Sequence, residues 1–124
     1  MALQRIKLEL ARDHDHPNGS RHHGYDFIAP LDDQGHLVVD EWRTQRERCR
    51  VKRFWEGNKD EIGHLVRKPG GSWAFHYDVN GPVDSDESGY RFGHHVFKPG
   101  EYVSIKEHDG EVRTFRVISV QDLD

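Results

Sequence analysis

The sequence predicts a mainly-β protein: a small antiparallel barrel or strongly bent sheet of seven to eight strands with one short helix. Several segments alternate apolar and polar residues with the two-residue period of a half-buried strand. Turn signals rich in Gly and Pro recur between these segments. One stretch, residues 40–48, lacks both Gly and Pro and favours a helix. Closure into a barrel would remove the exposed edges of such a sheet.

The first two strands are predicted to form a hairpin. Apolar residues alternate on both sides of Asn18-Gly19, a dipeptide that is the strongest short hairpin signal because both loop positions need positive φ. A two-residue loop there sets Leu10 opposite Phe27. The alternative is a disordered polar loop over residues 13–24 that joins two shorter strands.

The second hairpin is predicted to turn at residues 68–71, where Pro followed by Gly suits the central positions of a type II turn. This turn places alternating residues of both strands on one face: Ile62, His64, Val66, Trp73, Phe75 and Tyr77.

The third hairpin turns at Asp109-Gly110. A two-residue loop sets Val103 opposite Arg116. A three-residue loop with Gly110 in the left-handed region sets Val103 opposite Phe115. This second register is favoured because it pairs two apolar residues on the buried face.

The remaining strands are predicted over residues 49–55, 90–96 and 101–106. In the first of these, Cys49 is expected to point inward. The helix is expected at 40–48, with Asp40 as its N-cap. Residues 78–89 are expected to form an acidic, mobile loop.

Composition limits the class of protein. The chain of 124 residues fits a single domain, 1–124, and 34% hydrophobic against 32% charged residues is polar for a globular protein. The net charge of −4 gives no global basic field for nucleic acid. No apolar run approaches a membrane span or a signal peptide, and the single cysteine fits a reducing compartment, so a cytoplasmic protein is expected.

Three histidines near the first turn are the most chemically specific feature. In the hairpin register His14 and His16 share one face, about 7 Å apart, and His23 lies across from His14. Three such imidazoles could hold zinc or another divalent transition metal with one position open, as the metal site of an enzyme does. The alternative is a solvated hairpin tip without a cofactor.

A basic segment and an aromatic set are two further candidate sites. Arg43, Arg46, Arg50 and Lys52 lie among aromatic residues, a pattern that can bind nucleic acid, although a solvated helix and edge strand explain it better and the acidic chain disfavours nucleic acid as a partner. The aromatic set could line a ligand pocket inside the barrel or fill its core: Trp73, Phe75, Tyr77, Tyr90 and Phe92.

The second half of the chain resembles a group of small, uncharacterised bacterial single-domain proteins. The resemblance is carried by residues 61–67 with 71–75, and by residues 89–93 with 99–103. It implies a small bacterial domain and transfers no activity, cofactor or site residue.

These observations favour a non-catalytic binding or interaction module with a small molecule or protein as partner. No nucleophile elbow and no phosphate-binding Gly-rich loop is present in the sequence. A histidine-coordinated metal protein is the second hypothesis, and nucleic-acid binding through the basic segment is the third.

Overall fold

The computed structural model is a closed antiparallel barrel in which each strand pairs with the next and β1 pairs with β8. It describes residues 3–13, 15–80, 87–90 and 92–123. The strands are β1 (Leu3–Leu10), β2 (Ser20–Pro30), β3 (Arg50–Trp55), β4 (Glu61–Arg67), β5 (Trp73–Val79), β6 (Glu87–Tyr90), β7 (Tyr102–Lys106) and β8 (Val112–Asp122). The predicted fold class is confirmed.

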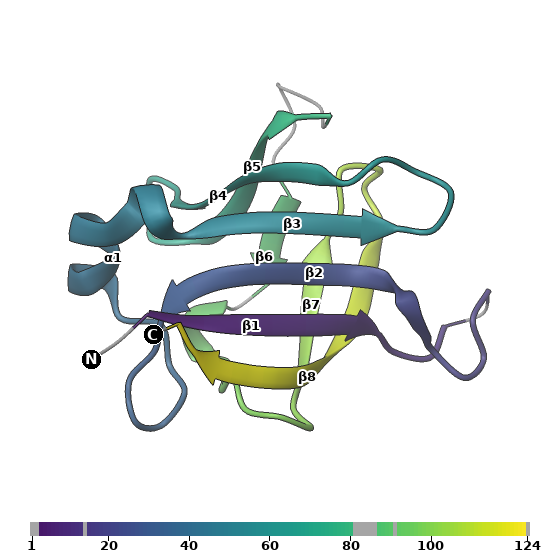
Figure 1. The fold of residues 1–124 in the computed structure, drawn as a ribbon, viewed down its shortest axis with the longest axis horizontal. Coiled ribbons are helices and arrows are strands. Elements are labelled where there is room, and N and C mark those ends of the chain that lie inside the picture. The colour runs from purple at the N-terminus through teal and green to yellow at the C-terminus, as the bar shows by residue number, and fades with distance from the viewer. Residues whose placement is uncertain (1–2, 14, 81–86, 91, 124) are drawn as a thin grey trace.

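A short helical segment connects β2 to β3. It consists of α1 (Val39–Gln45) and the 3-10 turn η1 (Arg46–Arg48). Figure 1 shows α1 at one end of the barrel, beside the start of β1 and the end of β8, while the β1–β2 and β3–β4 connections lie at the other end. In the part of the chain that the structure describes, no helix has the length and apolar character needed to cross a membrane.

Aromatic rings fill the middle of the barrel. Phe75 contacts Phe27 and Phe92, with ring centroids 5.2 and 5.7 Å apart, and Phe92 contacts Phe97 at 5.3 Å. At the helix end, Trp42 packs edge-to-face on Trp73 and donates its indole N–H to the carbonyl of Leu65. The inner face is therefore a packed core rather than an open lumen.

The predicted register of the first hairpin is wrong by four residues. Ile6 rather than Leu10 pairs with Phe27, and β1 ends at a bulge between Glu9 and Leu10. The next residues form a loop because the Asp13 carboxylate accepts the backbone N–H groups of residues 15 and 16. The shift is even, so the apolar residues of both strands still face inward.

The predicted facing of the second hairpin is also wrong. Arg67 pairs with Trp73 and Leu65 with Phe75, so it is Leu65 rather than His64 that lies inside with Phe75. Gly71 has φ +93° and adds a third residue to the loop between Lys68 and Ser72, which bond backbone to backbone. One extra residue reverses the faces of a strand. The third hairpin has the preferred register, with Val103 opposite Phe115 and Gly110 at φ +87°.

Three boundaries differ from the prediction. The strand expected over 90–96 ends early, and Phe92–His94 forms the 3-10 turn η2, whose Phe92 ring packs on Gly89. The N-cap of α1 is Val38, and Asp40 lies in the first turn, where its negative charge interacts favourably with the helix dipole. The expected loop 78–89 is partly strand, since β5 continues to Val79 and β6 begins at Glu87, while residues 81–86 lie outside the described part.

Candidate functional site

The end of the barrel opposite α1 is built from ionisable and hydroxyl side chains. In an antiparallel barrel of this order, the starts of β2, β4, β6 and β8 meet the ends of β3, β5 and β7 at one end. These strand ends and the β7–β8 turn supply the polar end cluster: Tyr25, Arg53, Glu61, Tyr77, Glu87, Glu107, His108 and Arg113.

The local sequence explains why charges point inward here. Side chains alternate between the two faces of a strand. The next inward-facing position after Val51 is therefore Arg53, and the next one after Ile105 is Glu107. Arg53 is 6% exposed and Glu107 is 2% exposed. Buried charges require partners, and the neighbouring strand ends provide them.

Two arginines hold the acidic side of the cluster. The guanidinium of Arg53 donates to Glu107 at 3.1 Å and to Glu61 at 3.0 Å. Arg113 donates to the second oxygen of Glu107 at 2.6 Å. Glu107 therefore has an arginine on each carboxylate oxygen, and such charge-assisted hydrogen bonds are about twice as strong as neutral ones.

Glu87 has a different environment, although it is fully buried. Its Oε1 atom contacts the hydroxyls of Tyr77 at 2.6 Å and Tyr25 at 2.8 Å. Burial raises the pKa of Glu87, against the opposing effects of the Tyr77 hydrogen bond and the charge of Arg53. Burial also raises the pKa of both tyrosines well above the ordinary range.

Aromatic side chains cover the outside of this cluster. The guanidinium groups of Arg53 and Arg113 lie 4.3 and 5.4 Å from the Trp55 ring centroid. His23 packs edge-on against Trp55 at 4.3 Å, and His16 lies 4.7 Å from His23. Burial, followed by the neighbouring His16, lowers the pKa of His23.

The predicted zinc site is only partly within the described residues, because His14 lies outside them. The Nδ1 atom of His16 is 3.3 Å from Asp13, and that of His23 is 2.7 Å from Ser20. Across the described ranges, no group of three potential ligands has the geometry to hold a metal ion. The zinc site stays a prediction.

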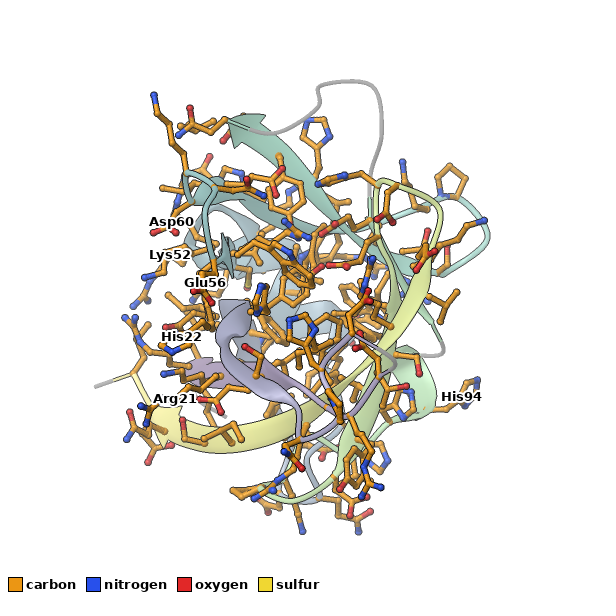
Figure 2. The ribbon with its side chains drawn as sticks, turned by 90° about the vertical axis from the view of Figure 1, so that its right-hand side faces the viewer. Arg21, His22, Lys52, Glu56, Asp60 and His94 are labelled. Atoms are coloured by element: carbon orange, nitrogen blue, oxygen red, sulfur yellow. The ribbon has the colours of Figure 1, made fainter. Side chains whose placement is uncertain are left out.

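Figure 2 looks onto the polar end and shows Arg21 and His22 on one side, with His94 on the opposite side.

The predicted aromatic pocket residues belong to the packed core. Trp73, Phe75, Tyr77 and Phe92 are all buried, and the side chain of Tyr90 lies outside the described part. The best-formed grooves of the described surface have other linings and include none of these rings. Of the set, only Tyr77 joins the polar end cluster.

The structure divides the predicted nucleic-acid residues between two surfaces. Arg43 and Arg46 line a groove at the helix end of the barrel, whereas Arg50 and Lys52 line a separate hollow on the outside of β3 that also contains Asp26. Arg50 is moreover engaged by His64, with 3.0 Å between the two nitrogens.

The groove at the helix end is strongly basic. It has a volume of about 690 Å³, and no carboxylate is among the described residues that line it. We call it the basic groove; its lining is Trp42, Arg43, Arg46, Arg67, Lys68, Pro69, Gly70 and Gly71. It is open to solvent and gathers positive charge on a protein whose net charge is negative.

Sequence reasoning missed most of these residues. Glu87 was assigned to a loop, and neither the other charged members of the polar end cluster nor Arg67 and Lys68 were singled out. The alternation of inward-facing apolar residues, continued by two residues beyond Val51 and Ile105, identifies Arg53 and Glu107. Comparisons of the chain with protein-family models, curated proteins and solved structures found no match.

Proposed function

We propose that the protein is a binding module that holds a small phosphate-bearing ligand in the basic groove. One observation carries the proposal: cationic side chains from two separate parts of the chain line a single open groove without a described carboxylate among them. Arg43 and Arg46 come from the α1–η1 segment, while Arg67 and Lys68 come from the end of β4 and its turn.

The arginines are arranged so that a ligand can engage them. Among the described residues Arg43 pairs with exposed Asp40, at 3.3 Å, and such surface pairs contribute little, so a bound anion could replace Asp40. Arg46 lies 5.8 Å from the Trp42 ring centroid. Arg67 lies 5.6 Å from the Trp73 ring centroid, which holds its guanidinium near the groove. Planar guanidinium groups match phosphate oxygens in pairs.

The turn at the groove adds accessible backbone. Gly70 has φ +94°, and a Cβ built there would meet no atom within 4 Å. A ligand can therefore approach the main chain closely at this position. The acidic net charge of −4 and the separate location of Arg50 and Lys52 favour a small phosphate ester or pyrophosphate over a long nucleic acid.

The test is a calorimetric titration with pyrophosphate at low ionic strength. Arg46→Gln and Lys68→Gln are each expected to weaken binding about tenfold, because each removes a hydrogen bond to a charged group. Arg48→Gln is the matched control, since Arg48 is an exposed neighbour of Arg46 that does not line the groove.

Equal weakening by all three substitutions would show a diffuse charge effect and contradict the groove. Absence of pyrophosphate binding to the wild-type protein would overturn the proposal. Raising the salt concentration should weaken binding, because the Debye length falls from about 30 Å at 0.01 M to about 10 Å at 0.1 M.

A further inference from the structure

Three close contacts between hydroxyl and carboxyl oxygens in the polar end cluster need more hydrogens than two tyrosines and two ionised carboxylates provide. Tyr77 contacts Glu87 Oε1, Tyr25 contacts the same oxygen, and Tyr25 also makes a short contact with Glu107 Oε2. Each close oxygen pair needs one hydrogen between its members. The two phenols supply two hydrogens for these three contacts, so a carboxyl group must supply the third.

Glu87 is the carboxyl that can carry it. Both oxygens of Glu107 accept a hydrogen bond from an arginine, at 3.1 and 2.6 Å. Glu87 Oε1 instead meets two hydroxyls, and its Oε2 accepts the backbone N–H of His108 at 3.2 Å, with Arg53 Nε at the longer distance of 3.4 Å. A chain of donors then runs from Tyr77 to Glu87, from Glu87 to Tyr25, and from Tyr25 to Glu107.

The surrounding charges favour the same assignment. The two arginines, Arg53 and Arg113, are already shared among the carboxylates of Glu61, Glu107, Asp109 and Glu111. Ionisation of Glu87 would add a further negative charge at a fully buried position, which is costly in a medium of low dielectric even with Arg53 Nε 3.4 Å from Glu87 Oε2.

We propose that Glu87 is a buried proton-binding site that keeps its proton at neutral pH, with His108 as the side chain that exchanges this proton with solvent. The His108 Nε2 atom lies 3.7 Å from Glu87 Oε2 and 3.1 Å from Glu61 Oε1. The His108 side chain is 27% exposed, whereas that of Glu87 is inaccessible. His108 thus lies between the buried acid and the solvent. Transfer to it requires the Glu87 carboxyl group to turn so that the proton shared with Tyr25 comes to the side of His108, and requires a His108 Nε2 atom that carries no hydrogen and takes this proton on toward solvent.

Every neighbouring strand contributes a group that affects this proton. Arg53 favours the ionised form of Glu87, while Glu107 and burial favour the protonated form. The ionisable groups that face Glu87 or its direct partners come from six elements: Tyr25 of β2, Arg53 of β3, Glu61 of β4, Tyr77 of β5, Glu107 and His108 at the end of β7, and Arg113 of β8.

The assignment fixes the sign of a pH effect. A folded-state pKa above the ordinary value near 4.5 means that, between pH 4.5 and the raised pKa, the folded protein binds up to one more proton at Glu87 than the unfolded chain does. Stability from this group is complete below pH 4.5 and is lost as the pH rises toward the raised pKa. In that range the folding constant falls by up to tenfold per pH unit.

The test compares the wild-type protein with Glu87→Gln, which mimics the neutral acid. The ratio of wild-type to variant folding constants should fall as pH rises from about 4.5, and the control Glu101→Gln, at an exposed position, should show no such trend. A ratio independent of pH would overturn the proposal. If Glu87→Gln does not fold, infrared difference spectra of the wild-type protein test whether Glu87 is protonated. A band from a protonated buried carboxyl at pH 7 is expected in the wild-type protein, and its absence would overturn the assignment.

The role of His108 has its own readout. In D₂O the buried carboxyl band shifts as its proton exchanges, and His108→Leu should slow this exchange severalfold while leaving the band in place. An unchanged exchange rate would remove His108 from the path but would leave the proton on Glu87.

Discussion

Replacement of Arg53 by Met should destabilise the barrel more than any other single charge removal at the polar end. Arg53 donates to Glu61 at 3.0 Å and to Glu107 at 3.1 Å, and its side chain is 7% exposed. Removal of one partner from a buried ion pair costs about 3–5 kcal/mol, because the remaining charge stays buried. Two carboxylates lose a partner here, and Met retains the contact with the Trp55 ring. We therefore expect a loss of at least about 3 kcal/mol.

Urea unfolding at pH 7, followed by tryptophan fluorescence and circular dichroism, measures this loss. Arg50→Met is the matched control, since Arg50 lies on the same strand but faces solvent, and a change within about 0.5 kcal/mol is expected. Adding Glu61→Gln to Arg53→Met should recover part of the stability, because Glu61 loses its arginine in the single variant whereas Glu107 keeps Arg113. A loss below about 1 kcal/mol for Arg53→Met, or no recovery in the double variant, would refute the assignment of Arg53 as the charge that holds this end together.

Three further predictions concern other parts of the barrel. Tyr77→Phe removes a donor to buried Glu87 and should lower the free energy of unfolding by about 1–3 kcal/mol in urea titrations. Gly63→Ala should cost about 3 kcal/mol or more, because a Cβ at Gly63 would lie 1.8 Å from the carbonyl oxygen of His76; a native circular dichroism spectrum with unchanged melting would contradict this. Cys49 is buried, and burial raises the pKa of its thiol to about 11, so a disulfide reagent at pH 8 should label it only after unfolding.

The sequence predicts the barrel well wherever turn chemistry and apolar pattern agree. The third hairpin is an example, because Gly110 fixes a three-residue loop and the same loop sets Val103 opposite Phe115. The second hairpin fails because two consecutive glycines, Gly70 and Gly71, both adopt positive φ, so the loop is one residue longer than the Pro-Gly signal suggests. A single added residue exchanges the inner and outer faces of the strand, and no local feature of the sequence reveals it.

The assembly of the polar end cluster could not be predicted from local patterns. Extended by one step, apolar alternation places Arg53 and Glu107 on the inner faces of their strands, but it does not show which other groups they meet. Only closure of the barrel brings the ends of β3 and β7 together and shows that these two side chains face each other at 3.1 Å. The basic groove is similar, because Arg46 and Lys68 belong to segments that are joined only by tertiary packing.

Closure of the barrel end does not by itself require charges. A layer of well-packed apolar side chains of the same volume would be as stable as a buried ion-pair network or more stable, often by about 1–4 kcal/mol. What an apolar layer cannot provide is an exchangeable proton at a buried position, connected to solvent through a half-buried imidazole. Glu87 and His108 have this arrangement, with Oε2 and Nε2 3.7 Å apart. The charged end of the barrel is therefore better explained by its proton chemistry than by its contribution to stability.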